Sequence, residues 1–324
     1  MMGYVIGVDG GNTKTHYALF SNEGEMIRFI HLGTASHERF SGGFDDASRE
    51  LSKGIDMLLD GTGIKAADVS CAVFGLAGAD TSEQKLELEA RISKIGIKKN
   101  MVCNDAYLGI KAGTIKGYGV CSNNGTAASC TAIDGHGNRI QIGGTGYFYG
   151  DEAGGSYIEG MVVRKVYDSC FRRGKKTMMK DMLFEELKIS DDRLLVETAE
   201  KKIFAEGNKK GRLCYIAFLA AEEGDGPAIE ILEKSGTELA SSVAGAVDRL
   251  DFKSEPEIEV VMAGSVFVKA ESPVLKEIFM QHTQKHLDNR AVFRLLEVPP
   301  VSGAVIWALD AGYDIRKRII EAFK

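Results

Sequence analysis

The sequence is poor in the features that mark secreted, membrane-bound and zinc-binding proteins. Its 324 residues include no C-x-x-C pair and no cysteine spacing typical of a zinc site. The six cysteines are scattered, and we expect them to be buried free thiols. No apolar run approaches the roughly 20 residues of a spanning helix, and the first residues lack the basic-then-apolar layout of a signal peptide. These absences predict a cytoplasmic protein with no membrane partner.

An excess of basic charge is also missing. The chain has 40 Lys and Arg against 46 Asp and Glu, mixed along the sequence, for a net charge of −6. We therefore expect no nucleic-acid partner. No G-x-x-x-x-G-K-[ST] string occurs, which excludes the common P-loop. The length allows two domains, each with a substantial core.

The most informative stretch that is present is a glycine-led turn near the N-terminus. Residues 5–15 read V-I-G-V-D-G-G-N-T-K-T, and an extended apolar pattern resumes from Lys14 to Phe20. Two such segments around a Gly-Gly turn predict a hairpin whose backbone N–H groups can approach an anion, with glycine supplying positive φ. Asp9 can hold a hydrated Mg²⁺ through one carboxylate. The alternative is an ordinary turn with a solvated Asp.

The order of predicted elements repeats along the chain. Extended segments near 3–9, 14–20 and 25–31 precede a helix near 43–59, a strand at 69–75, a helix at 82–95 and a strand at 100–104. From Gly117 three further short strands follow, at 117–123, 127–134 and 138–143. Two diverged copies of a β-β-β-α-β-α unit are expected, which would place Asp9 and the turn 123–126 at equivalent positions facing one nucleotide.

Residues 151–250 are predicted to be helical. Apolar side chains from Ile229 to Leu250 recur three or four apart behind Asp225 as N-cap and Pro227 in the first turn. We interpret this as a core-facing helix, the alternative being a helix that binds a partner. A buried strand is expected at 257–267 and a helix start at 299–309, both with small residues that permit close approach of a flat ligand or another backbone.

Five segments in this order carry a family resemblance: D-G-G-N-T-K-T (9–15), C-N-D-A (103–106), S-N-N-G-T-A-A-S (122–129), M-A-G-S-V (262–266) and S-G-A-V-I-W-A-L (302–309). Together they resemble the sugar kinase, actin and heat-shock ATPase superfamily. Residues 142–160, I-G-G-T-G-Y-F-Y-G-D-E-A-G-G-S-Y-I-E-G, are similar to a segment of the N-acetylglucosamine kinases and the BadF/BadG/BcrA/BcrD ATPase family.

The resemblance implies an α/β fold of two ribonuclease H-like, actin-like ATPase domains facing a nucleotide cleft. We expect an N-terminal domain at 1–115, a C-terminal domain with a helical insertion at 116–309, and a helix at about 310–324 that packs back on the N-terminal domain. The implied activity is ATP-dependent phosphorylation of an amino sugar with Mg²⁺, with N-acetylglucosamine, N-acetylmuramic acid or glucosamine as substrates. We also expect a homodimer.

The resemblance assigns roles to individual residues. Asp9 would position Mg²⁺, and Asp105 would be the general base that accepts the proton of the sugar hydroxyl. ATP would be bound by a first phosphate loop (residues 9–15), a second phosphate loop (122–129) and an adenosine segment (262–266), and the sugar by a second set that includes Asp105. The ATP set is Gly10, Gly11, Asn12, Thr13, Lys14, Gly125, Thr126, Gly264 and Ser265, and the sugar set is Ser36, His37, Asp105, Gly143, Gly144, Thr145 and Asp151.

Two of these aspartates have structural alternatives. Asp105 opens the stretch A-Y-L-G-I-K-A and could instead cap a helix, and Asp151 could cap a helix at 152–170. Three departures from the family concern the substrate. Ser36 stands where the kinases have a longer Asn, Thr145 replaces an aromatic residue, and the second loop reads N-N-G-T-A-A, whose asparagines tolerate left-handed backbone. Ser36 and Thr145 predict tolerance of a bulkier or differently substituted amino sugar.

Two other classes of function compete with the kinase. A BadF-type activator of a partner dehydratase would need cysteines in glycine-rich turns to hold an iron–sulfur cluster, and these turns have none. A nucleotide-binding regulator without catalysis would be expected to lack Asp105, which is present.

Overall fold

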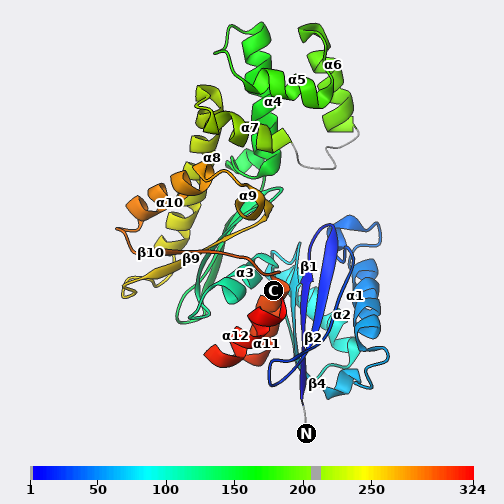
Figure 1. The fold of residues 1–324 in the computed structure, drawn as a ribbon. Coiled ribbons are helices and arrows are strands. Elements are labelled where there is room, and N and C mark those ends of the chain that lie inside the picture. The colour runs from blue at the N-terminus through cyan, green and yellow to red at the C-terminus, as the bar shows by residue number, and fades with distance from the viewer. Residues whose placement is uncertain (1–2, 206–212) are drawn as a thin grey trace. The chain divides into compact units, whose positions relative to one another are not determined.

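Residues 3–205 and 213–324 are described here from a computed structural model (Figure 1). The contacts divide the chain into two units, one of Met1–Cys121 with Leu296–Lys324 and one of Ser122–Leu295. The expected boundaries at 115 and 309 therefore need correction. Helix α11 (Val301–Leu309) packs against β1 (Tyr4–Gly10) and so joins the first unit. Gly7 of β1 permits this packing, because a Cβ there would lie 2.8 Å from the backbone nitrogen of Val305.

The first unit is built on a five-stranded sheet in the order β3-β2-β1-β4-β5. Strands β1, β2 (Lys14–Ser21) and β3 (Met26–Gly33) are antiparallel neighbours, and β4 (Val69–Leu76) and β5 (Asn100–Cys103) continue the sheet in parallel with β1. The predicted hairpin and the following β-α-β order are confirmed. The carboxyl ends of β1, β4 and β5 therefore meet at one edge, where parallel sheets commonly place ligands.

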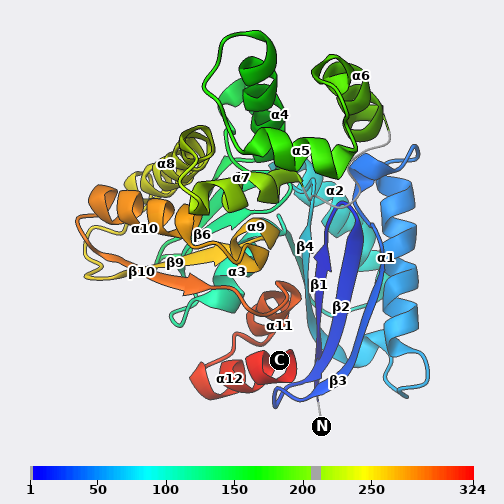
Figure 2. The same ribbon diagram turned by 45° about the horizontal axis from the view of Figure 1, so that its top comes forward.

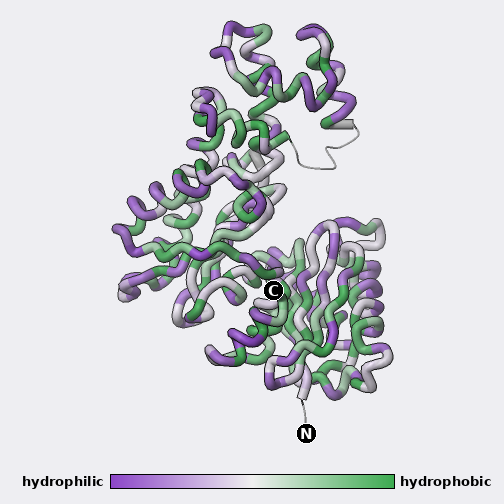
Figure 3. The backbone as a smooth tube through the Cα atoms, in the orientation of Figure 1, coloured by the Kyte–Doolittle hydropathy of each residue, from purple (hydrophilic) through white to green (hydrophobic). Residues whose placement is uncertain are grey.

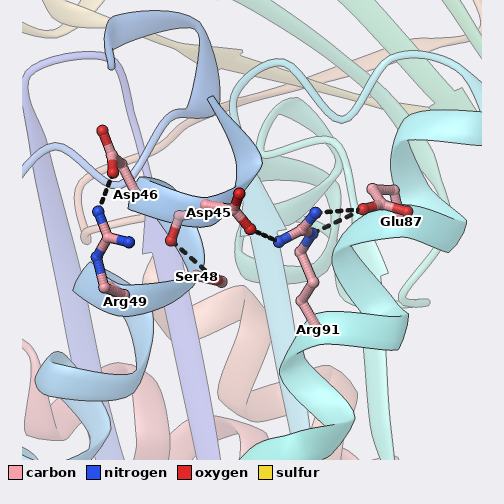
Figure 4. A network of polar contacts seen from close by, with 6 residues as sticks. All are labelled: Asp45, Asp46, Ser48, Arg49, Glu87 and Arg91. Atoms are coloured by element: carbon pink, nitrogen blue, oxygen red, sulfur yellow. Dashed lines mark hydrogen bonds and ion pairs between the residues drawn. The ribbon is translucent and has the colours of Figure 1, made fainter. Parts of the chain in front are cut away.

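Both faces of this sheet are covered by helices (Figure 2). One face packs on α1 (Phe44–Leu59) and α2 (Ser82–Ile92), and the other on α11 and α12 (Tyr313–Ala322). Hydropathy alternates along α1, as its single buried face requires (Figure 3). Arg91 of α2 contacts Asp45 of α1 and Glu87 of its own helix (Figure 4). Helix α3 (Ala106–Gly113) follows β5 directly and packs on α11.

The second unit repeats the sheet of the first. Its order is β10-β9-β6-β7-β8, which places three consecutive strands beside two later ones as in the first unit. The strands are β6 (Gly119–Asn124), β7 (Ala128–Ile133), β8 (Arg139–Gly143), β9 (Ile258–Ala263) and β10 (Ala291–Leu295). The internal repeat predicted from the sequence is confirmed, and with it the two ribonuclease H-like units.

Helices make up most of the rest of the second unit. They are α4 (Gly155–Phe171), α5 (Met179–Leu187), α6 (Leu195–Ala199), α7 (Leu213–Glu222), α8 (Gly226–Asp248), α9 (Ser265–Lys269) and α10 (Val274–His286). Asp225 caps α8 as predicted, its carboxylate accepting from the N–H of Ala228 at 2.9 Å. Ile229 is 38% exposed and so does not belong to the core face. Residues 206–212, part of the helical region expected at 151–250, lie outside the described residues.

All six cysteines are free thiols, and Cys103, Cys121, Cys130 and Cys214 are buried. Within residues 3–205 and 213–324, no helix combines the length and the apolar character needed to cross a bilayer.

Candidate active site

The first phosphate loop and two carboxylates line one cavity in the first unit. The cavity has a volume of about 370 Å³ and is lined by Asp9, Gly11, Thr13, Lys14, His16, Asp105, Pro299 and Pro300. Asp9 lies near the end of β1, opposite His16 of β2. The Nδ1 of His16 is 3.6 Å from the carboxylate of Asp9. Residues from three separate segments of the chain thus meet at the edge where β1 and β5 end.

The turn between β1 and β2 is tight, but hydrogen bonds and close packing make it so, and not a positive φ at its glycines. The N–H of Gly11 donates to the carbonyl of Lys14 at 2.9 Å, and the hydroxyl of Thr34 donates to the carbonyl of Gly11 at 3.0 Å. Neither Gly10 nor Gly11 has a positive φ, so that part of the prediction is wrong. A Cβ on Gly10 would instead lie 2.7 Å from a methyl group of Leu76. Glycine is required there by close packing.

Asp105 lies between β5 and α3 with its carboxylate free of the helix cap. No cap hydrogen bond reaches its side chain, and the N–H of Ala106 donates to the Oδ1 of Asn104 at 2.9 Å. The amide of Asn104 also donates to the carboxylate of Asp80 at 2.7 Å. The local geometry therefore gives the capping role to Asn104, which the sequence analysis did not single out.

Burial raises the pKa of Asp105 to about 7, and the negative charges of Asp9 and Asp80 add to the increase. The backbone N–H groups of Asp105 and Ala106 oppose it. A carboxylate with a pKa near the pH of the cell can both accept and release a proton, which is the property of an efficient general base. The electrostatics of this cavity thus suit proton abstraction.

Ser36 and His37 follow β3 outside this cavity, and each carries an unsatisfied polar atom. The Oγ of Ser36 and the Nδ1 of His37 are buried without a hydrogen-bond partner in the structure. The His37 ring stacks on Phe44 with a centroid distance of 4.1 Å. Gly78 approaches the same ring, because a Cβ there would lie 2.8 Å from its Cε1. Buried polar groups of this kind are usually satisfied by a ligand or water.

In the second unit, the second phosphate loop is joined to the start of α4. The N–H groups of Gly155 and Ser156 donate to the carbonyls of Gly125 and Thr126 at 2.8 Å and 3.0 Å. Asn124 lies at the end of β6, where its side chain is buried and its amide has no partner in the structure. Neither it nor Asn123 has a positive φ, so the left-handed backbone that asparagine tolerates is not used here. Both asparagines belong to an ordinary strand.

The adenosine segment packs directly on this loop. Gly264 has a φ of +91°, and a Cβ there would lie 2.4 Å from the carbonyl carbon of Asn124. Only glycine allows this conformation and this approach together. The structure therefore brings Gly264 and Ser265, which begins α9, beside the second phosphate loop, although some 140 residues separate the two segments in the sequence.

The sugar segment of the second unit is a loop of glycines closed by Asp151. Gly143 and Gly144 have φ values of +71° and +75°, and the Asp151 carboxylate accepts from the N–H of Gly146 at 2.5 Å. Asp151 does not cap the following helix, since α4 begins after Gly154. Thr145 is exposed.

A second cavity, of about 540 Å³, adjoins this loop within the second unit. It is lined by Thr126, Ala127, Gly144, Gly146, Asp151, Ala153, Ser156, Tyr157, Gly160, Met161 and Arg164. Sequence reasoning missed the α4 residues of this wall. Their three- and four-residue spacing was the available signal, but it does not by itself distinguish a cavity wall from a solvated face.

Two sheets of the same strand order, each with a glycine loop at the end of its first strand, define an actin-like ATPase fold. The chain belongs to the BadF/BadG/BcrA/BcrD ATPase family, which its residues 6–308 match. It is 28% identical to the N-acetylmuramic acid/N-acetylglucosamine kinase of Clostridium acetobutylicum, over 82% of this chain and 86% of that protein. It is 25% identical to the N-acetyl-D-glucosamine kinase of Dictyostelium discoideum, over 94% of this chain and 98% of that one.

The fold is also that of a solved structure from Chromobacterium violaceum, described as a candidate N-acetylglucosamine kinase. The TM-score is 0.69 at 18% identity, covering 94% of this chain and 98% of the other. These likenesses confirm the family resemblance and the α/β fold class expected from the sequence.

Proposed function

We propose that this protein is an ATP-dependent kinase that phosphorylates a hydroxyl group of an amino sugar, either N-acetylglucosamine or a close relative such as N-acetylmuramic acid or glucosamine. Family membership and the names of the two relatives support this activity. The observation that carries it is the placement of Asp105, with a pKa raised to about 7, in one cavity with Asp9 and the first phosphate loop. In a phosphotransferase, such a carboxylate accepts the proton of the attacking hydroxyl.

Mg²⁺ fits the residues of this cavity. Asp9 and Asp105 both line it, and the charge of Asp9 raises the pKa of Asp105, a repulsion that a cation would relieve. In the part of the chain that the structure describes, no group of three or more His, Cys, Asp or Glu side chains could hold a metal. That agrees with an ion held by one carboxylate, water and phosphate oxygens. When bound, Mg²⁺ would neutralise phosphate charge, with Asp9 holding it.

The remaining roles follow from the loops. The loop residues Gly10 to Lys14, with Gly125 and Thr126, would orient the phosphates of ATP, while Gly264 and Ser265 would contact the adenosine. Ser36, His37, Gly143, Gly144, Thr145 and Asp151 would contact the sugar, and the unpaired Oγ of Ser36 and Nδ1 of His37 are suited to its hydroxyls. Positioning and charge neutralisation supply most of the catalysis in phosphoryl transfer. A homodimer and a cytoplasmic location, both expected from the sequence, are part of the proposal.

Two measurements test this function. Titration calorimetry with a non-hydrolysable ATP analogue should show binding that strengthens when Mg²⁺ is present. A coupled ADP assay should then give turnover with amino sugars in a panel of N-acetylglucosamine, N-acetylmuramic acid, glucosamine, N-acetylmannosamine and glucose. Nucleotide binding without turnover of any sugar would contradict the kinase and favour an activator or a regulator. A clear preference for N-acetylglucosamine over all others would contradict the broad specificity inferred from Ser36 and Thr145.

A further inference from the structure

The cavity beside α4 lies on the side of that helix opposite the proposed adenosine segment. Gly155 faces that segment, since a Cβ there would lie 3.6 Å from a methyl group of Val266 and 3.8 Å from the Sγ of Cys214. At 100° per residue, Tyr157, Met161 and Arg164 project roughly 180–240° away from Gly155. The face of α4 that lines the cavity is therefore turned away from the adenosine segment, while Thr126 and Ala127 of the second phosphate loop form another part of the wall.

The same cavity is continuous with the expected sugar loop. Gly144 and Asp151, both assigned to the sugar, form part of its wall. Its volume of about 540 Å³ falls in the range of small-molecule sites, about 300–1,000 Å³. Small or flexible side chains at Ala153, Gly160 and Met161 leave the space open. The cavity thus offers room for a group attached to the sugar.

Arg164 is the one basic side chain that lines this cavity, and its charge is uncompensated. Among the residues that the structure describes, none makes a hydrogen bond or ion pair with it. Its neighbour Lys165 is paired with Glu230 at 2.5 Å, and Arg172, which directly follows α4, with Asp168 at 3.4 Å. The one acidic side chain of the wall, Asp151, accepts from the N–H of Gly146. Arg164 is therefore available to an anionic ligand.

The reach of Arg164 suits a group a few bonds from the sugar ring. Its Cα lies about 12 Å along the helix axis from Ser156, near the sugar loop, at 1.5 Å per residue. Long side chains on a helix lean toward its N-terminus, which from Arg164 is the direction of that loop. The planar guanidinium matches a carboxylate with two parallel hydrogen bonds.

We propose that this cavity receives an acidic substituent of the amino sugar, such as an ether-linked carboxylic acid, and that Arg164 binds its carboxylate. The inference rests on the proposed kinase function and narrows its substrate class to sugars with a carboxylate-bearing side group. Ala153 and Met161 pack against the apolar part of the substituent. Arg164 is then a specificity-determining residue, while Asp105 remains the base for any accepted sugar.

The experiment compares kcat/KM for N-acetylmuramic acid and its methyl ester, which differ in one negative charge. We expect the wild type to favour the acid at least tenfold. Arg164→Met keeps the apolar stem but removes the charge, and should lower kcat/KM for the acid about 10- to 100-fold more than for the ester. Arg164→Lys should retain part of the preference. Arg172→Met removes a paired arginine outside the cavity and serves as the matched control, with both values unchanged.

The outcomes separate this inference from the function on which it rests. If the wild type phosphorylates no sugar, the proposed function fails. If it phosphorylates N-acetylglucosamine but treats acid and ester alike, or if Arg164→Met lowers both equally, the kinase stands and the role of Arg164 is refuted. Binding of the acid to each variant without nucleotide, measured by calorimetry beside the melting temperature, shows whether a loss reflects recognition or misfolding.

Discussion

Replacing Asp105 by Asn should make the protein less active and more stable at the same time. The pKa of this carboxyl is about 7 in the folded protein, against an ordinary value of 3.8, because it is buried beside Asp9 and Asp80. Between pH 4 and pH 7 the folded state holds a proton that the unfolded chain has released. The free energy of unfolding of the wild type therefore falls as pH rises through this window, and the full cost is present above pH 7.

The magnitude follows from the two pKa values. Each difference of one in pKa corresponds to about 1.36 kcal/mol, so ionised Asp105 lowers the free energy of unfolding by up to about 4 kcal/mol. Asn is neutral at every pH. We expect Asp105→Asn to exceed the wild type by up to about 4 kcal/mol at pH 8, with the difference vanishing below pH 4. The same change should lower kcat about 10²- to 10⁴-fold, because the proton acceptor is lost.

Urea denaturation at several pH values between 4 and 8, without nucleotide or Mg²⁺, measures the free energy of unfolding. The coupled ADP assay measures kcat. Exposed Asp248→Asn is the control and should change the free energy of unfolding by less than about 0.5 kcal/mol. For the wild type, kcat/KM should rise with pH and level off near pH 7. A stability difference that does not depend on pH would refute the electrostatic reasoning. A loss of activity below tenfold would refute the general base.

Three further outcomes are expected. Gly264→Ala should abolish binding of the ATP analogue or prevent folding, because its Cβ would lie 2.4 Å from Asn124 in a conformation that disfavours side chains. Calorimetry measures the binding. The control is Gly226→Ala, where a Cβ meets nothing within 4 Å. Ser36→Ala should leave the melting temperature near that of the wild type but raise KM for the sugar about 2- to 10-fold, since its Oγ has no partner among the residues that the structure describes. Arg91→Met should shift the midpoint of urea denaturation only slightly, because the carboxylates that Arg91 pairs with are exposed, and a large shift would show that these ion pairs hold α1 to α2.

The fold was accessible from the sequence because its signals are local. Strand segments of alternating or buried apolar residues gave β1 to β8 within one or two residues, and the Asp225–Pro227 pair gave the start of α8. The repeat was accessible because each half begins with three short strands joined by glycine turns. The boundary between the units was wrong, since α11 belongs to the first unit through its contact with β1. Such a contact joins residues about 300 positions apart and leaves no local pattern.

Within the site, sequence motifs predicted which residues are candidates for function. They did not predict why each residue is required, because that depends on tertiary contacts. Gly10 and Gly264 both occur in recognisable glycine motifs, yet Gly10 is required by a neighbouring side chain and Gly264 by a positive φ and a neighbouring backbone. Asp105 was assigned as a base from its motif, but its raised pKa comes first from burial and then from the charges of Asp9 and Asp80, which the fold brings near it from other segments of the chain. Arg164 belongs to no motif. Its importance as a candidate arises from an unpaired charge beside an open cavity, and both features exist only once the chain has folded.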